Sequence, residues 1–120
     1  MLKDDLYAIE SLRKEENIIS ATVTIDATHK IFDGHFPGQP VLPGVCTVEI
    51  LKELVSEQYG RSYNLQSANN MKFLSLVDPT QSNKLVFTIE CSEEDNSLKI
   101  NASASLEDET VTFKLKGVLV

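Results

Sequence analysis

The sequence predicts an α+β domain in which a mostly antiparallel sheet wraps around one long helix. Residues 44–59 have the periodicity of a long helix, and several other segments alternate between apolar and polar side chains, as strands do. Short polar turns at 94–96 and 107–109 join the last of these segments, which favours antiparallel pairing. A single helix covers one face of such a sheet, and 120 residues form one domain of ordinary size. We therefore expect a single domain over residues 1–120.

The N-terminal part is expected to hold a short helix and then a strand. Apolar residues recur at helical spacing in residues 2–13, which predicts a short amphipathic helix there; they are Leu2, Leu6, Ile9 and Leu12. Residues 18–27 alternate, with Ala21, Val23 and Ile25 on one face, and are predicted to be a strand.

Residues 29–44 are expected to form a rigid, packed loop. The segment HKIFDGHFPGQPVLPG contains three prolines and three glycines, which together specify a fixed backbone shape. It also carries apolar residues that must pack against something. Loops of this kind, held on a scaffold, are typical places for functional sites.

The rest of the chain is predicted to contain the central helix and the remaining strands. In the helix, one arc is apolar (Val48, Ile50, Leu51, Leu54 and Val55) and the opposite arc is polar (Glu49, Lys52, Glu53 and Ser56). Strands are expected at 67–77, 84–91, 98–106 and 110–118, giving about five in all. In the last strand we expect Val111, Phe113 and Leu115 to point inward and Thr112 outward.

Composition excludes several classes of protein. Hydrophobic residues make up 42% and charged residues 24%, close to globular averages, and the formal net charge of −7 argues against nucleic acid binding. No apolar run is long enough for a membrane span, and the charged N-terminus does not resemble a signal peptide. Cys46 and Cys91 form no metal-binding pattern, so we expect two reduced, buried cysteines, no metal, no cofactor and a cytoplasmic location.

Candidates for acid–base chemistry are few, because the chain has two histidines. His29 ends a strand without an obvious partner and is interpreted as an ordinary surface residue. His35 lies inside the rigid loop, and Glu49 follows it by fourteen positions in the helix. The plain alternatives are a loop histidine that satisfies backbone groups and a glutamate on a solvated helix face.

The loop and the start of the helix resemble a known family. The segment GHFPGQPVLPGV at 34–45, followed by Glu49, is similar to the signature of the FabZ/FabA-type 3-hydroxyacyl-[acyl-carrier-protein] dehydratases. The His-to-Glu spacing also matches that family. A weaker similarity runs from Met71-Lys72-Phe73-Leu74 to Val77-Asp78-Pro79.

This resemblance implies a hotdog fold and at least a homodimer, with His35 from one chain and Glu49 from the other in each site. It implies dehydration of a 3-hydroxyacyl thioester to the trans-2-enoyl thioester. His35 would remove the C2 proton, Glu49 would help to expel the C3 hydroxyl, and the backbone N–H groups of Gly44 and Val45 would bind the thioester carbonyl. Phe36, Pro37, Val41 and Glu53 would line the substrate site.

Physical chemistry supports these roles. Removing a C2 proton builds negative charge on the thioester oxygen, and a fixed N–H donor at a helix start stabilises that charge. Gly44 has no side chain, which favours close approach of a carbonyl, although Gly44 and the prolines could serve the loop's architecture alone. Hydroxide leaves poorly and needs an acid such as a buried carboxyl.

The sequence departs from the family at two positions after Glu49. Where the family has small apolar residues and a glutamine, this chain has Lys52 and Glu53. We hypothesise that these charges alter the pKa of Glu49 and disfavour a long apolar tunnel. A dedicated pathway for a polyene or another secondary acyl chain fits this better than housekeeping fatty-acid synthesis.

The expected partner is an acyl carrier protein bearing a phosphopantetheine-linked chain, or else acyl-CoA. Since the chain is acidic, a local basic contact is needed, and Lys30, Lys72 and Arg61 are candidates. Two alternatives stay open: a hotdog thioesterase, which would not need His35, and a non-catalytic subunit of a heterodimeric dehydratase.

Overall fold

The computed structural model describes residues 1–35 and 38–120 of the chain. The elements in chain order are β1 (Tyr7–Glu15), β2 (Ile18–Ile25), α1 (Ile31–Gly34), α2 (Gly44–Tyr59), β3 (Leu65–Phe73), β4 (Lys84–Glu94), β5 (Ser97–Ser105) and β6 (Val111–Leu119). The predicted bounds of the central helix are confirmed. That helix begins directly after Pro43, and its C-cap Gly60 has the left-handed φ of 68° that glycine tolerates.

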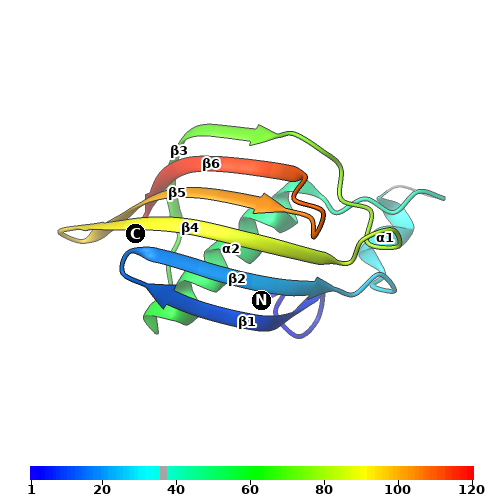
Figure 1. Cartoon of the computed structure of the whole chain (residues 1–120), viewed down its shortest axis with the longest axis horizontal. Helices are drawn as coiled ribbons and strands as arrows, with labels where there is room; N and C mark the ends of the chain where they lie inside the picture. Colours follow the sequence, from blue (N-terminus) through cyan, green and yellow to red (C-terminus); the bar gives the residue numbers. More distant parts are fainter. Residues whose placement is uncertain (36–37) are drawn as a thin grey trace.

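The strands form one antiparallel sheet in the order β1-β2-β4-β5-β6-β3. In Figure 1, α2 runs across one face of this curved sheet, β3 and β1 lie at its two edges, and α1 stands at one end. The predicted α+β class, with a sheet wrapped around one long helix, is confirmed. The described residues form six strands, against the five expected.

The additional strand is β1, so the prediction of a helix over residues 2–13 is wrong. The β1–β2 pairing contains a bulge between Ile9 and Ser11. A bulge adds one residue to a strand and thus reverses the alternation of its faces. Ile9 and Leu12, three positions apart, are therefore both partly buried against the core. This spacing imitates the periodicity of a helix.

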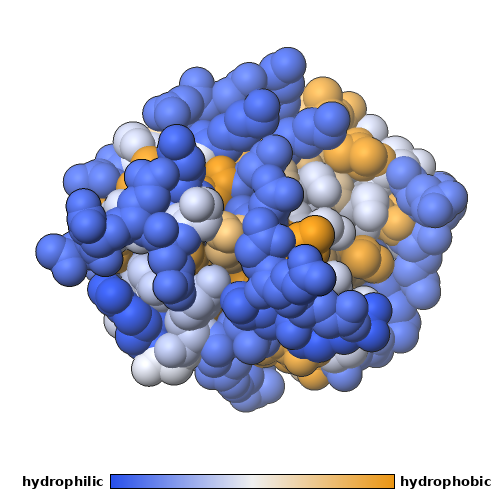
Figure 2. Space-filling model, turned by 60° about the vertical axis from the view of Figure 1, so that its left-hand side comes forward, coloured by the Kyte–Doolittle hydropathy of each residue, from blue (hydrophilic) through white to orange (hydrophobic). Residues whose placement is uncertain are grey.

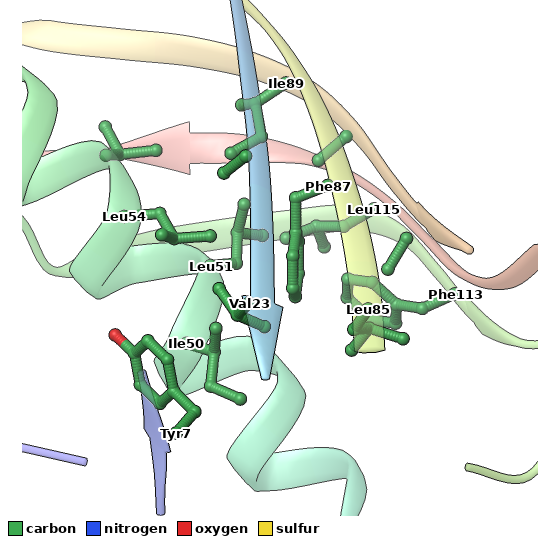
Figure 3. Packing of buried hydrophobic residues seen from close by; sticks show 14 of the residues in the cluster. Tyr7, Val23, Ile50, Leu51, Leu54, Leu85, Phe87, Ile89, Phe113 and Leu115 are labelled. Carbon is green, nitrogen blue, oxygen red and sulfur yellow. The ribbon is translucent and has the colours of Figure 1, made fainter. Parts of the chain in front are cut away.

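The core lies between α2 and the sheet. Ile50, Leu51, Leu54 and Val55 of the helix are at most 1% exposed, as the predicted apolar arc requires. Figure 3 shows Ile50, Leu51 and Leu54 of the helix facing the sheet. The strand residues there include Val23, Leu85 and Phe87. Burial of such side chains is worth about 1.5–3 kcal/mol each. This packing fixes α2, and with it the start of the helix, relative to the sheet.

The orientation predicted for the first part of β6 is wrong. Val111 is 36% exposed, whereas Thr112 is buried and donates a hydrogen bond of 3.2 Å to the carbonyl oxygen of Ala104. The β5–β6 register is irregular between Ala104 and Ser105, which shifts the alternation by one residue. Thr112 therefore faces inward beside Phe113.

The edge strand β3 pairs with β6 on one side, and its other side has no neighbouring strand in the sheet. Most of its residues are exposed, and the strand ends at Phe73 instead of the predicted residue 77. Gly117 of β6 lies against the backbone of β3. A Cβ at that position would be 2.4 Å from the carbonyl oxygen of Ser67. In the described part of the chain, no helix is long and apolar enough to cross a membrane.

Candidate active site

A pocket of about 370 Å³ opens between the start of α2 and the sheet. His35 and Val41 border it from the loop, Gly44 and Thr47 from the first turn of α2, and Phe113 from β6. The lining is completed by Leu42 of the loop, by Phe73 at the end of the edge strand, by Ser75, Leu76 and Val77 beyond it, and by Thr112. The structure thus brings three of the predicted site residues, His35, Val41 and Gly44, to one cavity with a mainly apolar wall.

His35 is held by the backbone of its own loop. Its imidazole Nδ1 lies 3.0 Å from the carbonyl oxygen of Val41, and the N–H of Val41 donates a 2.9 Å hydrogen bond to the carbonyl oxygen of His35. A carbonyl oxygen can only accept, so Nδ1 carries the hydrogen of the neutral ring. Nε2 then holds the lone pair that can take a proton.

The loop is also tied to the segment beyond β3. The N–H of Leu42 donates a 2.8 Å hydrogen bond to the carbonyl oxygen of Val77. This contact holds the loop beside the strand end and places Val41, which is 4% exposed, in the pocket wall.

The N-terminus of α2 faces this pocket. The first N–H groups of a helix have no partner within the helix and lie at the positive end of its dipole, and those of Gly44 and Val45 are in this position. A Cβ on Gly44 would stand 2.7 Å from Cζ of Phe73. The space over Gly44 is thus filled by an aromatic ring in this structure. Val45 itself is 75% exposed.

Glu49 does not line the pocket of its own chain. Its side chain is 36% exposed and its Oε1 lies 3.2 Å from Nζ of Lys52. Val45 and Glu49 are four residues apart and therefore share the exposed side of α2 near its start. Within one chain, the structure does not bring Glu49 and His35 to the same cavity.

Glu53 occupies a different environment from the solvated polar arc that periodicity predicts. It is only 6% exposed, and its carboxylate accepts hydrogen bonds from the N–H groups of Leu2 (2.8 Å) and Lys3 (3.0 Å) and from the hydroxyl of Tyr7 (2.9 Å). Burial opposes ionisation, but these donors outweigh it and hold the pKa of Glu53 below its ordinary value. Glu53 is not among the residues that line the pocket of its own chain.

Two residues predicted to line the substrate site, Phe36 and Pro37, lie outside the described residues. His29 does have partners, contrary to the prediction: its Nε2 lies 3.2 Å from Asp5, and its Nδ1 accepts the N–H of Ile31. Cys46 and Cys91 are buried and unpaired, as expected. Among residues 1–35 and 38–120, no three His, Cys, Asp or Glu side chains gather as a metal site.

Several pocket residues were not predicted from the sequence. Thr47 lies on the first turn of α2, and Ser75 and Leu76 follow β3. The similarity around Met71–Pro79 marked the segment but no individual role. Thr112 was assigned to the wrong face because the irregularity in the β5–β6 pairing leaves no mark in the hydropathy pattern.

Comparison with known proteins identifies the family. Residues 11–115 match the ApeI-like family, described as ApeI dehydratase. The chain is 34% identical over 107 residues to the 3-hydroxyacyl-[acyl-carrier-protein] dehydratase FabZ of Lactobacillus helveticus, covering 83% of this chain and 71% of that protein. It is 34% identical over 90 residues to the FabZ of Enterococcus faecalis, covering 69% of this chain and 61% of that protein.

Solved structures agree on the fold. The dehydratase heterocomplex ApeI:P from Xenorhabdus doucetiae is similar with a TM-score of 0.75 at 22% identity, covering 92% of this chain and 95% of that one. The PaaI protein of E. coli is similar with a TM-score of 0.67 at 13% identity, covering 94% and 81%. The chain has the hotdog fold and belongs to the ApeI-like family of dehydratases.

Proposed function

We propose that this chain dehydrates a 3-hydroxyacyl thioester to the trans-2-enoyl thioester, in sites shared between two copies. The observation that carries the proposal is the fixed imidazole of His35, bound through Nδ1 to Val41 at a pocket beside the start of α2. A base and a set of N–H donors at one cavity are what proton removal next to a carbonyl requires.

In the first part of the reaction, Nε2 of His35 takes the proton from C2 of the substrate. The electron pair of the C2–H bond moves toward the thioester carbonyl and forms an enolate. The N–H groups of Gly44 and Val45, at the positive end of the α2 dipole, donate to the enolate oxygen. The mainly apolar wall excludes water, which strengthens these interactions.

In the second part, the enolate electrons form the C2–C3 double bond and the C3–O bond breaks. Glu49 in its acid form donates a proton to the departing hydroxyl, so that water leaves. The carboxyl group ends as a carboxylate and His35 as an imidazolium, and transfer of one proton restores both groups.

Two copies are required because Glu49 of one chain does not reach its own pocket. Exposed apolar side chains lie along β3, on the segment after it and at the start of α2: Val45, Met71, Phe73, Leu74 and Leu76. The space-filling view in Figure 2 shows one face of the molecule, on which hydrophobic side chains are exposed between hydrophilic residues. An edge strand with unpaired backbone groups beside apolar residues favours pairing with a second copy. Such pairing would bring the exposed side of the second copy's α2 to the pocket, with Val45 and Glu49 of the partner subunit on it.

The proposed substrate carrier is an acyl carrier protein, the carrier named for the FabZ relatives, with acyl-CoA as the second form. Of the basic candidates, Lys72 lies with Lys114 and Lys116 along a hollow of about 520 Å³. Lys114 and Lys116 alternate with buried residues of β6, and Lys72 of β3 pairs with Lys114, so the hollow lies on the sheet face that points away from α2. Arg61 instead stacks on the ring of Tyr63, and Lys30 precedes α1. A cytoplasmic location, expected from the two unpaired cysteines, belongs to the same proposal.

The test measures two reactions of the purified protein. Hydration of crotonyl and longer enoyl thioesters is followed by loss of the enoyl absorbance, and hydrolysis of saturated acyl thioesters by release of free thiol. We expect hydration by the wild type, its loss in His35→Ala, and no thiol release. Thiol release without hydration would identify a thioesterase. Inactivity that a sister protein relieves would identify a subunit of a heterodimer.

A further inference from the structure

Thr47 is a buried hydroxyl side chain in the wall of the pocket beside His35, and the proposed reaction does not use it. It lies on the first turn of α2, three residues after Gly44, and is only 5% exposed. Side chains of a helix tilt toward its N-terminus, and residues three apart are neighbours on one face. The side chain of Thr47 is therefore directed back toward Gly44, where the helix begins.

The hydroxyl of Thr47 has no hydrogen-bond partner within residues 1–35 and 38–120. Comparable hydroxyls of the protein are bonded. In the same helix, the hydroxyl of Ser56 donates to the carbonyl oxygen of Lys52 at 2.8 Å. In the same pocket wall, the hydroxyl of Thr112 donates to the carbonyl oxygen of Ala104 at 3.2 Å. Thr47 thus brings an unused polar group to a mainly apolar cavity.

The hydroxyl oxygen of Thr47 opens into the pocket. Among the described residues that are not exposed, no side-chain oxygen is completely buried without a hydrogen-bond partner. The oxygen of Thr47 therefore keeps part of the small accessible surface of this residue, and that surface faces the cavity that Thr47 lines. Ser75, which also lines the pocket, is exposed and can bind water. A buried hydroxyl without a partner costs free energy, which a polar group of a bound ligand would offset.

The proposed substrate has two oxygen atoms close to the reacting carbons, the thioester carbonyl and the C3 hydroxyl. The carbonyl oxygen accepts only and is matched by the N–H groups of Gly44 and Val45, which only donate. A C3 hydroxyl both donates and accepts, as the hydroxyl of Thr47 does. The third carbon lies two bonds beyond the carbonyl carbon, and Thr47 lies about one turn beyond Gly44 on the same side of α2. The C3 hydroxyl is therefore the group that fits Thr47.

We propose that Thr47 is a substrate-binding residue whose hydroxyl hydrogen-bonds to the C3 hydroxyl of the 3-hydroxyacyl group. The inference rests on the proposed function, in which that hydroxyl leaves as water with a proton from Glu49. Thr47 selects acyl groups that carry the hydroxyl and holds it in place while His35 removes the proton from C2. Thr47 itself gains and loses no proton in this reaction.

The first experiment measures steady-state kinetics in both directions, with a 3-hydroxyacyl thioester for dehydration and the matching enoyl thioester for hydration. The proteins are the wild type, Thr47→Val, Thr47→Ser and Thr22→Val. At position 47, valine keeps the shape of threonine without its hydroxyl, and serine keeps the hydroxyl without the methyl group. Thr22→Val makes the same chemical change on the sheet face that points away from α2, because Thr22 alternates with the buried Ala21 and Val23.

In Thr47→Val, KM for dehydration should rise roughly three- to tenfold at unchanged kcat, the usual effect of one lost hydrogen bond. The enoyl thioester has no C3 hydroxyl, so KM for hydration should stay the same. The equilibrium constant of the reaction fixes the ratio of kcat/KM in the two directions, and kcat for hydration should therefore fall by the same factor. Thr47→Ser should regain most of the lost affinity, and Thr22→Val should match the wild type.

The second experiment needs neither turnover nor a folded variant at position 47. Calorimetry measures the affinity of the wild-type protein for two unreactive amides of pantetheine, one with a 3-hydroxybutyryl group and one with a butyryl group. We expect the hydroxylated amide to bind roughly three- to tenfold more tightly, because it alone offers a partner to Thr47.

The possible results separate the inference from the proposed function. An unchanged KM for dehydration, a rise of KM in both directions, or a loss that Thr47→Ser does not restore would each overturn the role of Thr47. Equal affinity of the wild type for the two amides would do the same. A wild type that prefers the hydroxylated amide but converts neither thioester would overturn the proposed function and support recognition of the hydroxyl by Thr47.

Discussion

The carbonyl oxygen of Val41 lies 3.0 Å from Nδ1 of His35, so the backbone of the loop determines which nitrogen of the ring carries hydrogen. We expect nitrogen NMR of the protein with a neutral His35 ring to show the hydrogen on Nδ1 and none on Nε2. The same geometry predicts that His35→Gln lowers kcat by about 10²–10⁴-fold, the usual contribution of a general base. A ring with its hydrogen on Nε2, or a variant with near wild-type kcat, would contradict this assignment.

A site shared between two chains predicts that inactive variants rescue each other. His35→Ala and Glu49→Gln are each expected to be inactive alone, because every site lacks one group. Mixed after unfolding and refolding together, they should regain about a quarter of wild-type activity, since half of the dimers are mixed and each has one intact site. Absence of rescue, with mixed dimers present by mass spectrometry, would place both groups in the same chain.

Gly44→Ala is expected to damage the pocket more than the fold. The new Cβ would stand 2.7 Å from the Phe73 ring, which is 54% exposed and can move away. Alanine favours a helix over glycine by roughly 1 kcal/mol, so the free energy of unfolding should change little. We expect kcat/KM to fall as the ring shifts across the helix start. Phe73→Ala in the same chain should remove part of this loss, so a strictly additive double-mutant cycle would show that the two residues are independent.

Gly117→Ala is expected to destabilise the protein, because two backbones meet there. The added Cβ would be 2.4 Å from the carbonyl oxygen of Ser67, which cannot rotate away as a side chain can. Overpacking of this kind costs about 1–3 kcal/mol. Urea unfolding measures the change. Gly34→Ala is the matched control, since a Cβ at Gly34 meets nothing within 4 Å, and an equal loss in both variants would refute the explanation.

Three turns predict how the free energy of unfolding depends on pH in the acid range. Asp26, Asp78 and Asp108 each accept a hydrogen bond from the backbone N–H of the threonine two residues later. The threonine hydroxyl and then its N–H lower the pKa of each carboxyl below the ordinary 3.8. A lowered pKa in the folded state adds stability above the unfolded value and loses it as the pH falls through the folded value.

The free energy of unfolding should therefore decrease as the pH falls below about 4. The triple Asp→Asn variant at positions 26, 78 and 108 should show a smaller decrease, because these groups no longer titrate. Urea unfolding at several pH values measures both slopes. Equal slopes in the two proteins would show that the turns do not contribute to acid unfolding.

Local signals explain which parts of the fold could be predicted. The bounds of α2 followed from Pro43 and Gly60, which act on the backbone where they stand. Strands β4 and β5 followed from the regular alternation of apolar and polar residues at 84–91 and 98–106. The start of β1 and the orientation of Thr112 did not, since both depend on a register irregularity that only the pairing of two strands creates.

The site shows the same division. His35 and Gly44 stand in a compact motif, and the structure places both at one pocket. The environment of Glu53 could not be predicted, because its donors are 46 to 51 residues away along the chain. Helical periodicity describes one helix in isolation and contains no information about a distant segment that covers its polar side.

The two edges of the sheet differ, and this difference limits how far the sheet can grow. β1 carries a bulge and a run of charged residues, Arg13, Lys14 and Glu15, whereas β3 has an open edge beside apolar side chains. Bulges and charges are the features by which natural sheets resist edge-to-edge polymerisation. If two copies pair through β3, the open β3 edges of both chains become paired. A β1 strand is then left at each outer end of the joined sheet. The dimer would then present only β1 edges, which resist further pairing. The strand whose bulge gives its apolar residues a helix-like spacing would thus also suppress fibrous aggregation.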